Sequence, residues 1–234
     1  MEYIKYKEIK KYITATREPF FRLAKKYINK NSKILDIGSG DGLFAKVLGR
    51  NDIHMLDGNE CTVESLKKEF PNVDYGQVPN LPYEDNFFDL IHSSHLIEHL
   101  TPQELHTFLK ECDRCLKING YLIISAPTLW DSFYNDMSHL KPYNPIIFEK
   151  YLCKGIEEGR TKSIISNKYK VIEKVYRYNM LPYYDNEIFI YSNFINKLLS
   201  LYKKFKYNLG FRKLEVSGYT IILKKIDNKE NSDE

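Results

Sequence analysis

The chain has 234 residues, 43% hydrophobic and 28% charged, which is the composition of an ordinary globular protein with one core. Its net charge of +4, from 35 basic and 31 acidic residues, is too balanced to indicate nucleic acid as a partner. Four irregularly spaced cysteines exclude a disulfide framework, and no run approaches the roughly 20 apolar residues of a membrane-spanning helix. Residues 1–11 lack the apolar stretch of a signal peptide, so we expect a cytoplasmic protein. The lysine, asparagine and isoleucine bias indicates an AT-rich bacterial genome.

Helical patterns and short apolar runs alternate through the first half of the chain. Residues 17–29 carry apolar positions at helical spacing, and residues 33–38 form an apolar run that stops at a glycine, as a buried strand does. Further helices are predicted at 41–50, 61–70 and 101–117, and further strands at 52–57, 72–76, 87–94 and 120–127. This alternation predicts an α/β fold with a parallel sheet covered by helices on both faces.

The second half of the chain follows a different pattern. Residues 128–168 are rich in aromatic and turn-forming residues, and we expect them to form a lid over the strand ends. Strands are predicted at 169–181 and 218–226, with a disordered tail at 227–234. We therefore predict a single domain over residues 1–226.

Between these two strands, residues 187–205 repeat apolar residues at helical spacing, and a basic run follows. Its cations are Lys203, Lys204, Lys206, Arg212 and Lys213. They could bind a phosphate, a nucleic-acid backbone or an anionic membrane. Our preferred interpretation is the solvated face of a helix whose apolar side covers the sheet.

The loop after the first strand indicates a nucleotide-like ligand. Glycines at 38, 40 and 42 let the backbone approach a ligand closely at the start of a helix. The dinucleotide fingerprint needs a glycine where this chain has Leu43, which disfavours NAD. Asp57 ends the second strand, 21 residues after Asp36, where a carboxylate would accept hydrogen bonds from ribose hydroxyls.

These residues, with the segments NLPYEDNFFDLIHSSHLIEHL and LKINGYLIISAP, resemble the class I S-adenosylmethionine (SAM)-dependent methyltransferases. The resemblance covers about residues 17–127 and the closing strands. It implies a Rossmann-like fold with a seven-stranded, mostly parallel sheet, a lid insertion after strand five, and SAM as cofactor, leaving S-adenosylhomocysteine.

The resemblance also implies roles for individual residues. The glycine loop would wrap the methionine part of the cofactor, Asp57 would hold the ribose, and Gln77 with Val78 would reach the adenine. Gln77 stands where aspartate is common, and Gly58 where a bulky apolar residue is common. The predicted cofactor-binding residues are Asp36, Gly38, Ser39, Gly40, Asp57, Gly58, Gln77, Val78 and Ser93.

The segment HLIEH contains His95, Glu98 and His99, a spacing that inverted zinc peptidases also use. The nucleotide fold argues against a peptidase, because His95 directly follows the fourth strand. Some relatives of the family bind a divalent metal at this place, and His139 of the lid could be a further ligand. Spacing alone does not show a site, and we predict no metal ligand.

We predict an enzyme that methylates a small polar or anionic acceptor at oxygen, possible acceptors being a saccharide or a phosphorylated or nucleotide-linked metabolite. Alignment of the acceptor supplies most of the rate, and a base is needed where the acceptor must lose a proton. His139 and His95 are the candidate bases, because imidazole titrates near neutral pH. The alternative for each is a structural histidine. Alternative functions are an RNA methyltransferase and a non-catalytic SAM-binding regulator or partner subunit.

Overall fold

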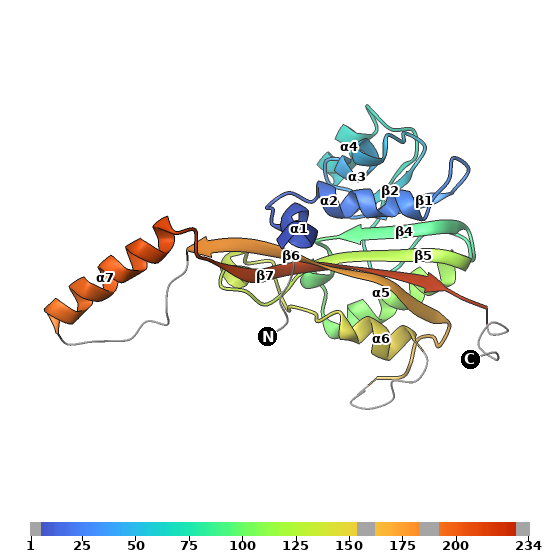
Figure 1. Ribbon diagram of the computed structural model, residues 1–234. Coiled ribbons are helices and arrows are strands. Elements are labelled where there is room, and N and C mark those ends of the chain that lie inside the picture. The colour runs from blue at the N-terminus through green and yellow to red at the C-terminus, as the bar shows by residue number, and fades with distance from the viewer. Residues whose placement is uncertain (1–5, 154–161, 183–191, 228–234) are drawn as a thin grey trace.

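A computed structural model describes residues 6–153, 162–182 and 192–227, and their strands form one seven-stranded sheet. The strand order is β3-β2-β1-β4-β5-β7-β6 (Figure 1). The strands are β1 (Ile34–Ile37), β2 (His54–Asp57), β3 (Val73–Tyr75), β4 (Phe88–Ser94), β5 (Leu116–Pro127), β6 (Tyr169–Pro182) and β7 (Arg212–Lys225). The first five are parallel, and β7 is antiparallel to both of its neighbours. The predicted seven-stranded, mostly parallel sheet is therefore confirmed.

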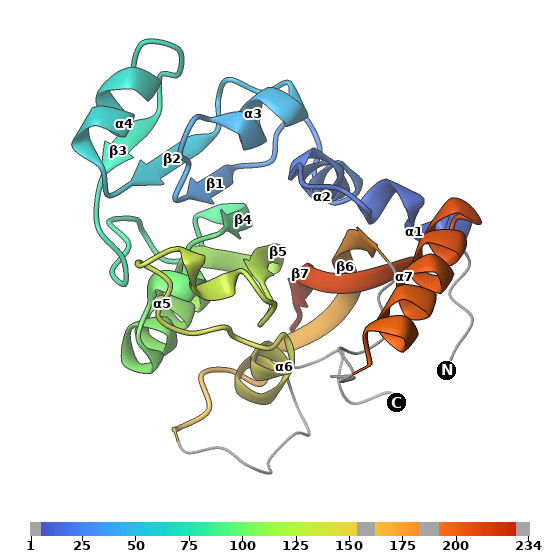
Figure 2. The same cartoon turned by 90° about the vertical axis from the view of Figure 1, so that its left-hand side faces the viewer.

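Helices cover both faces of this sheet. Figure 2 shows α2, α3 and α4 on one side of the strands and α5 and α6 on the other. The helices are α1 (Tyr6–Ile9), α2 (Glu18–Phe21), α3 (Leu43–Leu48), α4 (Glu60–Leu66), α5 (Pro102–Cys115), α6 (Ile146–Leu152) and α7 (Asn193–Asn208). Short 3-10 turns are η1 (Lys10–Tyr12), η2 (Arg22–Lys26), η3 (Ile97–His99) and η4 (Phe133–Asn135).

Two hydrophobic cores lie on opposite faces of the sheet, because successive side chains of a strand point to opposite sides. Ile34 packs with Phe21 and Phe44 from α2 and α3, whereas the next residue, Leu35, packs with Phe108 of α5 on the other face. All four residues of β1 are buried. The central strands are thus fixed on both sides, which holds their carboxyl ends in place.

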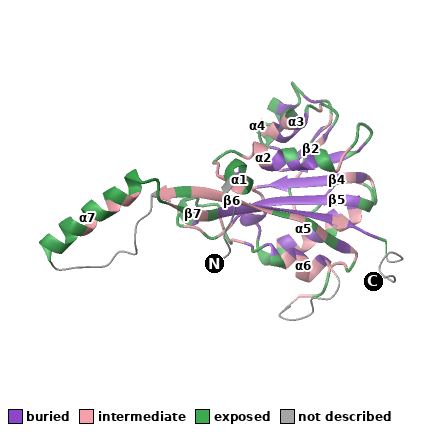
Figure 3. Ribbon diagram, in the orientation of Figure 1, coloured by how far each residue is buried: buried purple, intermediate pink, exposed green. Residues whose placement is uncertain are grey.

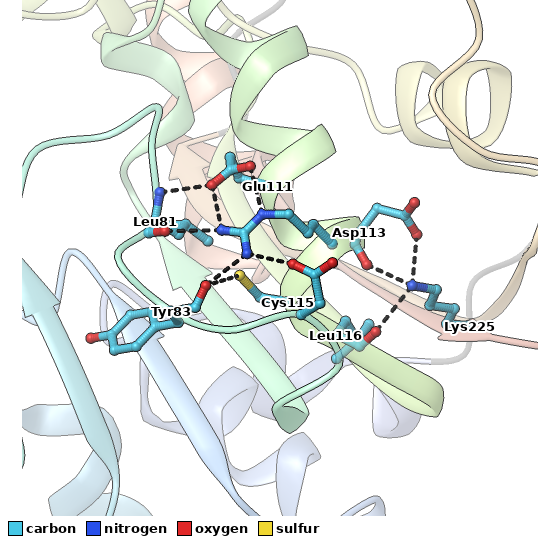
Figure 4. A network of polar contacts seen from close by, with 9 residues as sticks. Leu81, Tyr83, Glu111, Asp113, Cys115, Leu116 and Lys225 are labelled. Carbon is cyan, nitrogen blue, oxygen red and sulfur yellow. Dashed lines mark hydrogen bonds and ion pairs between the residues drawn. The ribbon is translucent and has the colours of Figure 1, made fainter.

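A polar network fastens α5 to the segment before β4 (Figure 4). The guanidinium of Arg114 donates to the carbonyls of Leu81 and Tyr83 at 3.0 and 2.7 Å, and to Glu111 at 2.7 and 2.9 Å. Glu111 also accepts from the Leu81 amide at 3.1 Å. The segment that leads into β4 is thereby held against α5.

The helix α5 carries two cysteines on its buried side. Cys112 and Cys115 are both buried, and neither forms a disulfide. Burial raises the pKa of the Cys115 thiol to about 11. Cys112 therefore acts as an apolar packing group, whereas the thiol of Cys115 also donates to the Tyr83 carbonyl at 3.8 Å.

The lid predicted at 128–168 contains η4 and α6 in its described part, and residues 154–161 lie outside the described residues. Phe148 and Leu152 of α6 are buried against the sheet. The amide of Leu140 donates to the carbonyl of Glu98 at 2.8 Å, which ties the segment to the turn after β4. Residues 228–234 of the predicted tail also lie outside the described residues.

The interpretation of the basic segment was wrong. Its helix, α7, has no buried residue, so its apolar side does not cover the sheet (Figure 3). The cause is the length of β6 and β7, which pair with each other beyond β5 and carry α7 away from the core (Figure 1). Residues 187–191 of the predicted helical stretch lie outside the described residues. No helix in the described ranges is both long enough and apolar enough to span a bilayer.

Candidate functional site

The loop after β1 has the backbone geometry that its glycines predict. Gly38, Gly40 and Gly42 have φ angles of 71°, 54° and 70°, in the left-handed region that glycine adopts without steric penalty. The amide of Gly38 donates to the Leu56 carbonyl at 2.8 Å, which fixes the loop to the end of β2. A Cβ atom on Gly40 would meet no heavy atom within 4 Å, so this side of the loop can be approached closely.

Asp57, at the end of β2, is joined directly to this loop. One carboxylate oxygen accepts from the Gly40 amide at 3.0 Å, and the other accepts from the Asn59 amide at 2.9 Å. The side chain is therefore oriented at the mouth of the loop, where it can also accept from hydroxyl groups. A Cβ on Gly58 would lie 3.4 Å from Gln77, so the ends of β2 and β3 meet here. Gln77 is exposed.

The carboxylate of Asp36 lies beneath the loop. Asp36 and His92 are both buried, and Asp36 Oδ1 is 2.7 Å from His92 Nδ1. The ring of Phe44 stacks on His92, with centroids 3.8 Å apart. Ser39 donates to the Asp36 carbonyl at 2.8 Å. A narrow cavity lined by Asp36, Ser39 and Ser94 reaches this pair, so a direct cofactor contact by Asp36 stays a prediction.

Unsatisfied polar atoms gather at the carboxyl end of β4. In the described part of the chain, His92 Nε2 and the hydroxyls of Ser93 and Ser94 are buried without a hydrogen-bond partner. Both carboxylate oxygens of Glu98 are also buried without a partner in hydrogen-bond geometry, although Oε1 lies within ion-pair distance of His95. Each buried polar atom without a partner lowers the stability of the folded protein by about 1–3 kcal/mol. Ser93 pairs with Ile37 of β1, so these atoms lie next to the glycine loop. This is the point where strand order reverses, and where such sheets bind ligands.

His95 directly follows β4 in a constrained conformation. Its φ angle of 56° is unusual for a residue other than glycine, and such outliers cluster at functional sites. Arg177 of β6 lies 3.1 Å from His95 Nε2, and Glu98 Oε1 lies 3.1 Å from His95 Nδ1. A guanidinium only donates, so Nε2 accepts and the proton is on Nδ1, facing Glu98. His95 thus connects a buried carboxylate to an arginine.

His99 and His139 face the same cavity with one ring nitrogen each. Nδ1 of His139 lies 2.7 Å from the Phe133 carbonyl, and Nδ1 of His99 lies 3.0 Å from the Ser138 carbonyl. Because a carbonyl only accepts, each Nδ1 carries the proton and each neutral ring keeps its lone pair on Nε2. Nε2 of His139 lies 4.0 Å from Glu98 Oε1. This geometry allows His139 to take a proton from a group in the cavity.

The same donors could hold a cation. One ligand atom from each of Glu98, His99 and His139 lies within 4.8 Å of the others. Histidines that bind metals commonly donate their other N–H to a carbonyl, as both do here. The expectation of no metal therefore stays a prediction. The structure also argues against a peptidase, because His95 precedes the 3-10 turn η3 and His99 ends it, so the two histidines do not lie on one α-helix.

Two arginines that the sequence did not single out complete the cavity, which measures about 350 Å³. It is lined by Ala15, Arg17, His95, Glu98, His99, Asp136, His139 and Arg177. Burial lowers the pKa of Arg177; the negative charge of Glu98 opposes this shift, and the positive charge of Arg17 adds to it. Neither arginine forms an ion pair closer than 4 Å with a carboxylate of the described residues. Neither Arg17 nor Arg177 belongs to a sequence motif, so only the fold shows that they line the same cavity.

This arrangement defines a class I, Rossmann-like methyltransferase fold, with the glycine loop and Asp57 at the switch point of the sheet. Residues 35–124 match the family model of the methyltransferase domain. Over this part of its length the chain is similar to SAM-dependent methyltransferases.

Individual relatives agree with this assignment. The chain is 32% identical over 98 residues to a probable S-adenosylmethionine-dependent methyltransferase of Mycolicibacterium smegmatis, covering 40% of this chain and 37% of the relative. It is 26% identical over 150 residues to phosphoethanolamine N-methyltransferase of Plasmodium falciparum, covering 53% and 52%. The chain thus spans about half or less of the length of these two relatives.

A solved structure supports the fold over most of the chain. A SAM-dependent methyltransferase from Archaeoglobus fulgidus superposes with a TM-score of 0.54 and 22% identity. The match covers 94% of this chain and 99% of that protein. At this identity the likeness concerns the fold alone.

Proposed function

We propose that this chain transfers a methyl group from SAM to an oxygen atom of a small, polar acceptor, a saccharide or a phosphorylated or nucleotide-linked metabolite. One observation carries the proposal: a histidine with a fixed proton on Nδ1 and a lone pair on Nε2 faces a cavity beside the glycine loop. We propose a bacterial origin, which the lysine, asparagine and isoleucine bias of the chain supports, and a cytoplasmic location.

The cofactor half of the site, comprising Gly38, Ser39, Gly40 and Asp57, fits SAM. Its backbone can be approached closely, and the carboxylate of Asp57 is held where ribose hydroxyls can donate to it. SAM would supply a methyl group on a positively charged sulfur. Gln77, which lies beside Gly58, and the next residue, Val78, would contact the adenine. Ser93 would lie near the loop, because it pairs with Ile37 at the end of β1.

The acceptor half of the site comprises Arg17, His95, Glu98, His139 and Arg177. In it, His139 Nε2 would remove the proton of the acceptor hydroxyl as the new bond forms. The buried carboxylate of Glu98, 4.0 Å away, would stabilise the charge that His139 gains. His95 would hold Glu98 and Arg177 in position, since its two ring nitrogens already face them.

Two guanidinium groups in this cavity support an anionic acceptor. Arginine binds phosphate and carboxylate groups through paired N–H donors. The positive charge of Arg17 lies close enough to lower the pKa of Arg177, so an anion between the two guanidinium groups would relieve their repulsion. The Plasmodium relative supports the same class, because its name identifies a phosphorylated acceptor.

The test combines two measurements on the same protein. Titration calorimetry with S-adenosylhomocysteine reports cofactor binding, and transfer of labelled methyl groups to small-metabolite extract or to RNA reports the acceptor. We expect binding of the cofactor product and labelling of the small-molecule fraction. Labelling of RNA would make the chain an RNA methyltransferase, and binding without transfer would make it a SAM-binding regulator or partner subunit.

A further inference from the structure

The helix α7 presents an apolar face that no described element covers. Phe194, Leu198, Leu201 and Phe205 recur at the spacing of one helix face and are between 51% and 71% exposed. Ser192 caps the helix, and its hydroxyl accepts from the Ile195 amide at 3.5 Å. The apolar face therefore belongs to a formed helix of 16 residues.

The charge on the same segment has a single sign. Residues 192–214 contain no aspartate or glutamate. They contain six cations, Lys197, Lys203, Lys204, Lys206, Arg212 and Lys213. At about 100° per residue, Lys197 and Lys204 border one side of the apolar face and Lys206 borders the other. An apolar face with cationic borders is the pattern of helices that lie in the surface of an anionic bilayer.

The position of α7 relates it to the catalytic end of the sheet. β7 pairs with β5 as far as Gly218, opposite Pro127, and its earlier residues pair only with β6. Because β7 is antiparallel to β5, this two-stranded ribbon leaves the sheet at the carboxyl ends of the parallel strands. Arg177 faces Gly218 at its base, and Arg212 lies about 20 Å further along at strand spacing. The helix at its tip thus lies beyond the end of the sheet that carries the cavity.

We propose that α7 docks this chain on an anionic phospholipid surface, with the apolar face inserted at the headgroup level and the lysines on the lipid phosphates. A second copy of the chain is a poorer occupant, because pairing two such faces would bring their cations together. RNA is also poorer, because a phosphate backbone leaves the apolar face exposed. The inference does not depend on the proposed function.

The test is cosedimentation of the full chain with vesicles of phosphatidylcholine alone or mixed with phosphatidylglycerol. We expect the protein to bind the anionic vesicles at least about tenfold more tightly than the neutral ones. Replacing Leu198 and Leu201 by glutamate should reduce the binding by more than about tenfold, because both side chains lie on the inserted face. Replacing Asn193 and Ser200 by glutamate introduces the same charge on the polar face of the helix. This control variant should therefore lose clearly less of the vesicle binding.

Circular dichroism and the melting temperature serve as fold controls, since all four substituted side chains are exposed. Equal binding to neutral and anionic vesicles, or equal losses in the two double variants, would overturn the proposal. A protein that binds no vesicles would also overturn the proposal. If light scattering then shows an oligomer that the double variant Leu198→Glu/Leu201→Glu dissociates, the apolar face of α7 mediates contacts between copies of the chain.

Discussion

The cofactor half of the site uses backbone amides and one carboxylate, and its four residues lie between positions 38 and 57. The acceptor half uses side chains from separated segments at Arg17, residues 95–98, His139 and Arg177. The first half depends on a local loop between two buried strands. The second half exists only when the lid, β4, β6 and the N-terminal segment pack together. Substitutions should therefore separate cofactor binding from turnover.

The largest effect should come from His139→Ala. We expect kcat to fall by about a hundredfold or more, because the hydroxyl proton loses its acceptor. The affinity for S-adenosylhomocysteine should not change, because His139 belongs to the acceptor half. The measurement is labelled methyl transfer beside calorimetry, with His106→Ala as control, since His106 contacts the Ser163 carbonyl outside the cavity. Full activity of His139→Ala would remove the base assignment.

Asp57→Ala should weaken cofactor binding, because Asp57 belongs to the cofactor half of the site. We expect the affinity for S-adenosylhomocysteine to fall about 10- to 100-fold, because hydrogen bonds to a charged group contribute about 1.5–3 kcal/mol. Calorimetry measures the change, and Glu64→Ala removes a nearby exposed carboxylate as the control. Unchanged affinity in Asp57→Ala would mean that this carboxylate only fixes the loop.

Arg177→Met should have a smaller effect, confined to the acceptor half. For an anionic acceptor we expect KM to rise about tenfold, while cofactor affinity is preserved. The exposed Arg22, which pairs with Glu18 at 3.6 Å, provides the control variant Arg22→Met. Equal KM values in the two variants would contradict an anionic acceptor held by Arg177.

The smallest effect should follow removal of metal ions. We expect the rate to be the same in EDTA and in calcium-saturated EDTA, because proton removal by His139, as proposed, would need no metal. Metal analysis of the purified protein should find less than one ion per chain. A rate that disappears in EDTA and returns with zinc or manganese would assign Glu98, His99 and His139 to a cation.

The sequence alone predicted the central strands of the sheet and the position of the loop that we propose binds the cofactor. Buried parallel strands are continuous apolar runs, and the glycine loop and Asp57 follow such runs directly, so their positions could be read locally. The same reasoning singled out His95 and His139 as candidate bases, because both are titratable residues next to a predicted strand or in a predicted lid, and their roles stay predictions.

Only the tertiary structure decided the acceptor half and the place of α7. Arg17 and Arg177 are 160 positions apart and have no motif, so nothing local relates them to one cavity. The helix α7 has the periodicity of a packed amphipathic helix, and sequence reasoning assigned its apolar side to the sheet. The long pairing of β6 with β7 carries it beyond the core instead. Periodicity specifies which face of a helix is apolar, whereas strand length and pairing decide what that face meets.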